Sequence, residues 1–142
     1  MKKTLEFKEQ FSGNGAPIWE VLASIGGVDR WFSIIRSCRV EGTGAGARRF
    51  CETADGGKLE ERIVSVDAAR RTLTYTVERG LPVDHYEGEF RVHEPTPGTA
   101  EVVWTVRFEG PASAVEQVEA MVKAVCPAGL RSLGEYAFRN VA

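Results

Sequence analysis

The chain has 142 residues, of which 43% are hydrophobic, so it is long enough to bury one core and we expect a single domain over residues 1–142. Its 18 basic and 20 acidic residues are interleaved and give a net charge of -2, so the composition offers no electrostatic footprint for nucleic acid. The first 30 residues carry charges every few positions and no long apolar run, which favours a cytoplasmic protein without membrane insertion.

The chain begins with a predicted strand and two short helices. Residues 4–12 form the strand, because apolar and polar side chains alternate along them. A helix follows over residues 17–25, where apolar residues have helical spacing and Pro17 stands near the first turn, at which its missing N–H has no cost. Two glycines end this helix. Asp29 can cap a second short helix that is expected to continue to residue 34 or 35.

Six more strands are predicted after the helices, because alternating stretches are separated by segments rich in Gly, Pro and Asp. They cover residues 37–42, 47–53, 58–67, 71–79, 86–94 and 99–110. The short breaks between them fit consecutive antiparallel hairpins. In the last three strands the alternation identifies the buried face. Its members are Leu73, Tyr75, Val77, Tyr86, Phe90, Val92, Val102, Trp104, Val106 and Phe108.

The strand over residues 58–67 has no clear inner face. Leu59 and Ile63 favour one face, whereas two valines favour the other. Alternation therefore leaves the orientation of Glu61 open.

Residues 112–140 return to a helical period, with valines and leucines at steps of three and four residues. We expect this long helix to pack on the sheet, and Pro127 should kink or interrupt it because proline removes a backbone hydrogen bond. A helix is only about 10 Å across with its side chains, so it cannot fill the concave side of a twisted seven-stranded sheet. A cavity between helix and sheet is the expected consequence.

The chain contains no motif for metal, phosphate or dinucleotide binding. Cys38, Cys51 and Cys126 have no metal-binding or redox spacing, so we interpret them as small apolar side chains, with a free reactive thiol as the alternative. The glycines of GTGAGA lack the flanking strand and helix of a phosphate loop. We therefore expect neither a cofactor nor a metal.

The order of elements resembles the helix-grip fold of the START, polyketide cyclase and birch-pollen-allergen superfamily, often called SRPBCC. The segments that carry the resemblance are IWEVLASIGGVDRWFSIIRSC, ERIVSVDAARRTLTYTVERG followed by YEG, and VVWTVRFEGP. They look most like the polyketide cyclase/dehydrase branch and, more distantly, like the plant abscisic-acid receptors. The resemblance implies an α+β fold in which a seven-stranded curved antiparallel sheet wraps around the C-terminal helix.

The similarity to the receptors implies three polar pocket residues. Arg36 of IIRSC stands where the receptors place a lysine that meets the ligand's carboxylate, and Tyr86 of DHYEG matches a pocket tyrosine. Glu61 of EERIVSVD matches a pocket glutamate, which implies that Glu61, Ile63 and Ser65 point inward. Arg36 and Glu61 would then orient a ligand, or they would form a structural ion pair at the cavity rim.

The remaining predicted pocket residues form its wall and its mouth. Tyr75, Val77, Phe90, Trp104 and Val106 supply the apolar and aromatic wall that the resemblance implies. The Gly-Leu-Pro gate of the receptors lies between strands three and four, whereas Leu81 and Pro82 of this chain fall between strands five and six. We therefore expect these two residues to form the lip of a pocket and not a hormone gate.

His85 is the titratable residue closest in sequence to these positions. Its neighbour Asp84 could orient the ring for acid/base chemistry. The alternative is an exposed turn histidine, which is favoured because alternation from Tyr86 points His85 away from the cavity.

Three functions remain open from the sequence. The first is a binding protein, a monomer or a homodimer, that holds a small hydrophobic molecule (a lipid, an aromatic or a polyketide-like compound) with a polar or acidic end near Arg36. The second is an enzyme of the aromatase/cyclase or dehydratase type, in which Tyr86, Glu61 and Arg36 position and protonate a poly-carbonyl chain. The third is an interaction protein whose cavity is filled by its own side chains.

Overall fold

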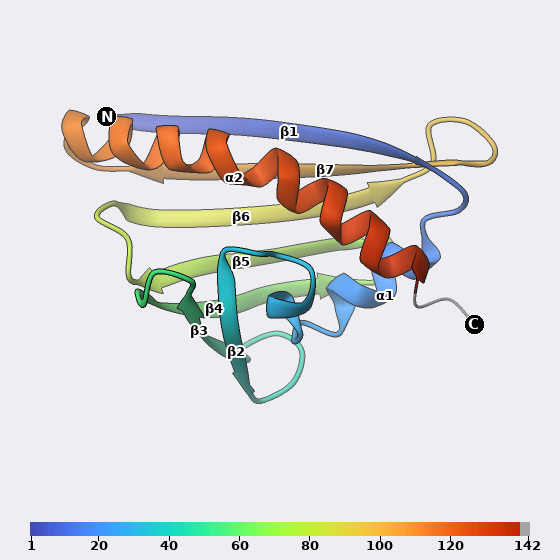
Figure 1. Cartoon of the computed structure of the whole chain (residues 1–142), viewed down its shortest axis with the longest axis horizontal. Helices are drawn as coiled ribbons and strands as arrows, with labels where there is room; N and C mark the ends of the chain where they lie inside the picture. The colour runs from blue at the N-terminus through green and yellow to red at the C-terminus, as the bar shows by residue number, and fades with distance from the viewer. Residues whose placement is uncertain (140–142) are drawn as a thin grey trace.

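The computed structural model describes residues 1–139 and consists of one open sheet and one long helix, with two short helical segments between the first two strands (Figure 1). The strands are β1 (Lys2–Ser12), β2 (Ile35–Glu41), β3 (Arg48–Thr53), β4 (Lys58–Asp67), β5 (Thr72–Arg79), β6 (Asp84–His93) and β7 (Thr99–Glu109). The helical segments are α1 (Ala16–Ala23), the 3-10 turn η1 (Val28–Arg30) and α2 (Ala112–Arg139).

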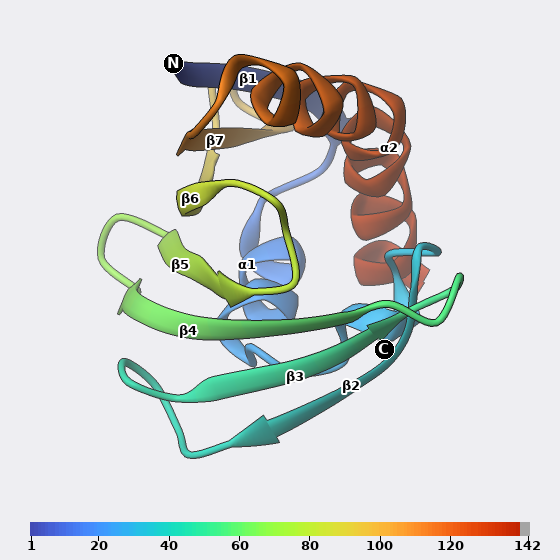
Figure 2. The same ribbon diagram turned by 90° about the vertical axis from the view of Figure 1, so that its left-hand side faces the viewer.

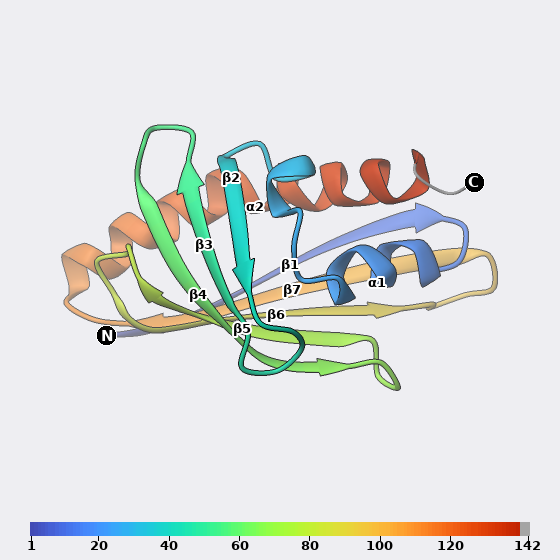
Figure 3. The same ribbon diagram turned by 90° about the horizontal axis from the view of Figure 1, so that it is seen from below.

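The seven strands lie in the order β1-β7-β6-β5-β4-β3-β2, and every neighbouring pair is antiparallel. Hairpins join β2 through β7 in sequence, and β1 is added beside β7 at the far edge. The sheet is strongly curved, and its concave side faces α2 and α1 (Figures 2 and 3). The predicted α+β architecture with seven strands is therefore confirmed. The second short helix is shorter than expected, because it is limited to one 3-10 turn.

A bulge explains why β4 has no simple alternation. Its pairing with β5 shifts register between Ile63 and Ser65, where Val64 is the extra residue on β4; at a second shift, between Glu60 and Glu61, the extra residue lies on β5. As a result Ile63 and Val66, three positions apart, both lie opposite inner-face residues of β5. Glu61 faces inward, as predicted. The expectation for Ser65 is wrong, because it lies opposite a threonine on the outer face.

The helix α2 is continuous through Pro127, which has no backbone N–H to donate, and the helix bends in this region (Figures 1 and 2). Its first half runs along β1 and β7, and its second half turns toward α1 (Figures 1 and 2). The predicted kink is present, whereas an interruption is not; the predicted end at Asn140 lies outside the described residues. Within residues 1–139 no helix has the length and apolarity required to cross a membrane.

Glycines let α2 approach the sheet and the η1 segment closely. A Cβ atom on Gly134 would lie 2.1 Å from the ring of Phe11, and one on Gly129 would lie 2.8 Å from the ring of Phe32. Real Cβ atoms do not come so close, so these aromatic rings occupy the space that a larger residue would take. The helix is thereby seated against β1 at one end, and the space under its middle is left open.

Candidate functional site

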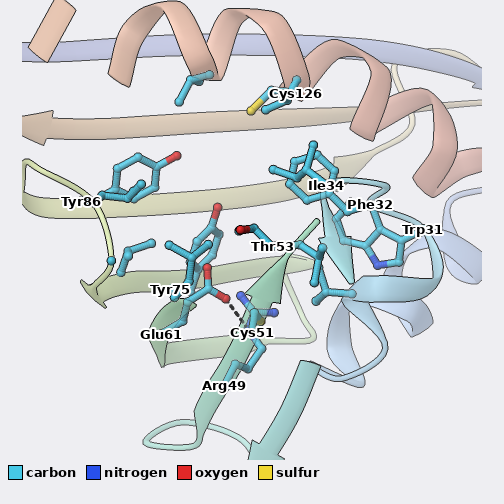
Figure 4. Close-up of a pocket in the computed structure, with 18 of the residues that line it drawn as sticks. Trp31, Phe32, Ile34, Arg49, Cys51, Thr53, Glu61, Tyr75, Tyr86 and Cys126 are labelled. Atoms are coloured by element: carbon cyan, nitrogen blue, oxygen red, sulfur yellow. Dashed lines mark ion pairs between the residues drawn. The ribbon is translucent and has the colours of Figure 1, made fainter. Parts of the chain in front are cut away.

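A cavity of about 480 Å³ lies between the concave face of the sheet and α2, and it is partly open to solvent (Figure 4). The sheet contributes Arg49, Cys51, Thr53, Lys58, Leu59, Glu61, Leu73, Tyr75, Val77, Tyr86, Phe90 and Trp104 to its wall. The helix α2 contributes Met121, Val122, Val125 and Cys126, and the segment around η1 contributes Val28, Trp31, Phe32, Ile34 and Ile35. The space is therefore not filled by the protein's own side chains, contrary to the premise of an interaction protein with a closed core.

Most of the predicted pocket residues line this cavity. Those that do are Glu61, Tyr75, Val77, Leu81, Tyr86, Phe90 and Trp104. Ile63 and Val106 are fully buried in the core but do not border the cavity. Pro82 is exposed and lies outside it, so only Leu81 of the predicted lip borders the mouth.

Arg36 is the prediction that the structure corrects. Its side chain is 55% exposed and forms an ion pair with Glu52 on the surface. The pairing of β2 with β3 shifts register between Ile35 and Ser37, which turns the intervening residue out of the regular alternation. Arg36 therefore neither lines the cavity nor contacts Glu61.

Arg49, and not Arg36, is the arginine that lies on the cavity wall beside Glu61. It lies on β3 directly opposite Glu61 of β4, and the two residues are 5% and 9% exposed. A signal for it was present in the sequence. Two consecutive arginines occupy the strand at residues 48–53, and because side chains alternate between faces, one of them has to point inward.

The buried guanidinium of Arg49 contacts two groups, the carboxylate of Glu61 and a backbone carbonyl. Arg49 Nε lies 2.9 Å from Glu61 Oε1 (dashed line in Figure 4), and Arg49 Nη1 donates a hydrogen bond to the carbonyl oxygen of Ile25 at 3.1 Å. The Nε–H bond is not aligned with the carboxylate oxygen and has no hydrogen-bond partner among the described residues. The contact with Glu61 is therefore mainly an attraction between charges.

The opposite charges of Arg49 and Glu61 cancel, so this buried pair has no net charge. Burial acts to lower the pKa of Arg49, but the neighbouring carboxylate of Glu61 raises it, and the net pKa lies above its ordinary value. Arg49 is consequently a permanent cation whose countercharge is already in place. The pair contributes no net charge with which to attract an ionic ligand.

Tyr75 lies at the centre of the polar wall. Its hydroxyl oxygen accepts a hydrogen bond from Trp104 Nε1 at 3.2 Å, and the Arg49 guanidinium lies 5.1 Å from the centre of its ring. Gly88 on β6 lies directly opposite Tyr75, and a Cβ atom there would be 2.2 Å from the tyrosine ring. The glycine in YEGEF is thus the sequence feature that lets the ring of Tyr75 lie across the sheet.

Tyr86 presents a free hydroxyl group to the cavity (Figure 4). Its ring stacks on Phe108 with the centroids 5.6 Å apart, and among residues 1–139 its hydroxyl has no hydrogen-bond partner. Burial raises the pKa of both Tyr75 and Tyr86 well above the usual tyrosine value. Both groups are therefore neutral O–H donors near neutral pH.

Aromatic rings form the rest of the wall beside these tyrosines. Phe90 and Trp104 stack with centroids 4.4 Å apart, and Phe32 meets Trp104 edge to face at 5.6 Å. Trp31 stacks on Phe32 at 5.6 Å. Such a wall offers flat, polarisable surfaces to a ring-shaped molecule.

The histidines lie outside the cavity. His85 is exposed and its Nε2 lies 3.6 Å from Glu109, so the expected exposure is confirmed. The residue lies at the start of β6, however, and not in the preceding turn. His93 pairs with Glu101 at 2.7 Å on the outer face. Within residues 1–139 no three His, Cys, Asp or Glu side chains are grouped in a way that could hold a metal ion.

Comparison with solved structures shows the same fold over the whole chain. The Zhui aromatase/cyclase from Streptomyces sp. R1128 superposes with a TM-score of 0.85 and 24% identity, covering 100% of this chain and 97% of that one. Norcoclaurine synthase from Thalictrum flavum, in complex with dopamine and hydroxybenzaldehyde, superposes with a TM-score of 0.82 and 14% identity, covering 100% of this chain and 90% of that one. At these identities the likeness establishes the helix-grip fold alone.

Sequence comparison is more specific about the family. No curated protein matches the chain significantly in sequence. The family model described as "Polyketide cyclase / dehydrase and lipid transport" matches residues 10–137, and the chain therefore belongs to this family.

Proposed function

We propose that the protein binds a small, hydrophobic and uncharged molecule in the cavity beneath α2. The observation that carries this proposal is the composition of the buried wall, which is apolar and aromatic except for neutral hydroxyl and thiol groups and the Arg49–Glu61 pair, whose charges balance. Two further charged residues, Asp55 and Lys58, border the cavity, but both are exposed to solvent. The volume of about 480 Å³ is typical of small-molecule sites, which are mostly apolar with a few placed polar groups.

The wall favours a ring system over a flexible chain. Four aromatic side chains from β6, β7 and the η1 segment present ring faces and edges to the same space. The similar structures support this choice, because one is named as an aromatase/cyclase and another holds dopamine and hydroxybenzaldehyde. An aromatic or polyketide-like compound is the ligand class that we propose, and a lipid is the alternative within this family.

The polar groups favour a carbonyl or hydroxyl oxygen on that ligand. Tyr86 and Tyr75 can each donate an O–H hydrogen bond into the cavity. A buried carboxylate would need an uncommitted cation in the buried wall, but Arg49 is neutralised by Glu61. Arg36 lies outside the cavity, and Lys58, which borders it, is exposed to solvent. The expectation of an acidic end near Arg36 is therefore replaced by that of a neutral polar oxygen.

Calorimetric titration with three probes tests this proposal. Naphthol is neutral and aromatic, naphthoate carries a carboxylate on the same ring system, and decanol is a flexible apolar chain. We expect naphthol to bind at least about tenfold more tightly than naphthoate, because burying an unpaired carboxylate is costly.

Tyr86→Phe should weaken naphthol binding by about fivefold. Tyr136→Phe on α2 is the control outside the cavity wall. Preferred binding of naphthoate would contradict the neutral ligand, and preferred binding of decanol would favour a lipid.

A cyclase or dehydratase activity in the same cavity is the second candidate. It is favoured by the free hydroxyl of Tyr86, which can protonate a carbonyl oxygen, on the same cavity wall as the carboxylate of Glu61. Turnover of a poly-carbonyl thioester should be abolished in Tyr86→Phe and in the double variant Arg49→Met/Glu61→Leu, which removes the carboxylate without leaving a buried unpaired cation, while the binding of naphthol persists. Unchanged turnover in both variants would reject these roles.

A further inference from the structure

Cys38 and Cys51 face each other across the β2–β3 hairpin. They are direct partners in the antiparallel register, both thiols are free, and their sulfur atoms are 3.1 Å apart. Opposed residues in antiparallel strands have Cα atoms about 4.5 to 5.5 Å apart, which lies within the range that a disulfide spans. The sulfur atoms would need to approach by only about 1 Å to bond.

The two thiols differ in accessibility. Cys38 is partly exposed and lies on β2, which is an edge strand of the sheet. Cys51 is 4% exposed and borders the ligand cavity on its inner side. An oxidant from solvent therefore reaches Cys38 first and leaves Cys51 as the second, internal thiol.

The surroundings also favour Cys38 as the thiolate. The pKa of Cys38 is lowered, first by the hydrogen bond that Cys51 donates to it and, against the effect of burial, by the positive charge of Arg49. The same hydrogen bond, together with burial, raises the pKa of Cys51. A more acidic, accessible thiol beside a protonated one is the arrangement of an attacking and a resolving cysteine.

We propose that Cys38 and Cys51 are a reversible redox pair that closes an intramolecular disulfide between β2 and β3 when the protein meets a hydroperoxide. The Cys38 thiolate attacks one peroxide oxygen, so that an S–O bond forms, the O–O bond breaks and hydroxide leaves. The Cys51 sulfur then attacks the sulfenic acid, forming the S–S bond and releasing the oxygen as water with the Cys51 proton. Overall two thiols lose two electrons and hydrogen peroxide becomes two waters.

The disulfide would hold the edge strand to the rest of the sheet. It closes a short loop around the turn between β2 and β3, and this constraint on the unfolded chain should raise the melting temperature by roughly 10 °C. It also converts a thiol of the cavity wall into a disulfide sulfur at Cys51. This inference is independent of the ligand that the cavity takes.

Cys126 provides an internal reference thiol. It lies on α2, across the cavity from Cys51 (Figure 4), and burial raises the pKa of its thiol to about 12. It has neither an opposed cysteine nor thiolate character at neutral pH, so we expect it to stay reduced.

Thiol mapping of the full chain tests the proposal. The reduced protein is treated with one equivalent of hydrogen peroxide at pH 7, alkylated and digested, and its peptides are identified by mass spectrometry. We expect a peptide pair joined through Cys38 and Cys51, an alkylated Cys126, and complete reversal by dithiothreitol. Cys126→Ala should form the same link, and Cys38→Ser should form none. The oxidised wild type should melt about 10 °C above its reduced form, and Cys38→Ser should show no such rise.

Two results would overturn the proposal. One is oxidation of Cys38 to sulfinic acid, or linkage between two chains, without an internal Cys38–Cys51 peptide pair. The other is loss of internal linkage in Cys126→Ala. The mapping is done on the wild type, so it decides the question even if a cysteine variant does not fold.

Discussion

At the scale of single residues, the Arg49–Glu61 pair is the feature on which the site depends. Both side chains are almost completely buried, and the pair is held by charge, with Arg49 also bonded to the Ile25 carbonyl. Taking two charges out of water is costly, so such a pair adds little net stability compared with apolar residues, but breaking it leaves an uncompensated charge. The pair thus fixes the polarity of the cavity more than it strengthens the fold.

Replacing Glu61 alone should therefore strongly destabilise the folded protein. Glu61→Leu leaves the Arg49 cation buried without its counterion, and we expect the free energy of unfolding to fall by about 3 to 5 kcal/mol, measured by urea denaturation. The double variant Arg49→Met/Glu61→Leu should recover most of this loss. Glu60→Leu is the matched control, because Glu60 pairs with the half-exposed Arg48 at 3.2 Å and should cost no more than about 1 kcal/mol. Equal losses in Glu61→Leu and Glu60→Leu would contradict a buried pair.

At the scale of elements, neighbouring elements are matched so that a small residue on one accommodates a large residue on the other. Gly88 of β6 lies opposite Tyr75 of β5, and Gly134 of α2 receives the ring of Phe11 from β1. The β5–β6 hairpin sets the first of these contacts and the packing of α2 on β1 sets the second, and both determine where aromatic rings can lie over the sheet. The polar wall of the cavity therefore depends on strand register as much as on the residues that form it.

A methyl group at Gly88 should displace the ring of Tyr75. The new Cβ would lie 2.2 Å from the ring, so Gly88→Ala is expected to destabilise the protein by about 1 to 3 kcal/mol through overpacking. It should also break the hydrogen bond from Trp104 to Tyr75, which near-ultraviolet circular dichroism can detect. In a Tyr75→Ala background the same substitution should cost much less. A cost that is unchanged in that background would show that the glycine matters for another reason.

At the scale of the whole molecule, protonated groups from β5, β6 and α2 are gathered around one cavity. Burial raises the pKa of Tyr75, Tyr86 and Cys126 above their values in an unfolded chain. Below those unfolded values the two states bind the same protons and the full stability is present. Above them the unfolded chain loses protons that the folded protein retains, so stability is lost as the pH rises.

We therefore expect the free energy of unfolding to fall from about pH 9 upward, with a slope of about 1.4 kcal/mol per pH unit for each retained proton. Urea denaturation between pH 7 and pH 11 measures this slope. Tyr86→Phe removes one of the groups and should make the decline above pH 10 shallower by up to that amount. An unchanged slope in the variant would indicate that Tyr86 ionises in the folded state as it does in the unfolded chain.

The order of the elements and their buried faces could be predicted from residue patterns alone. Alternation in residues 71–110 and the helical period after residue 112 identified which faces are buried, because these periods follow from backbone geometry within each element. The same patterns placed Tyr75, Tyr86, Phe90 and Trp104 on the inner face, and the mismatch between one helix and a wide sheet anticipated a cavity.

The polar part of the site, in contrast, depends on how the strands pair in the folded sheet. A bulge in β2 breaks the alternation of that strand, so the residue at position 36 turned outward. Arg49 became the partner of Glu61 through the register in which β3 pairs with β4. The opposition of Cys38 and Cys51, thirteen positions apart, likewise exists only once β2 and β3 pair in register. Local periodicity fixes the face that a side chain takes within a regular element, whereas register shifts and contacts between strands are settled by the packing of the whole sheet.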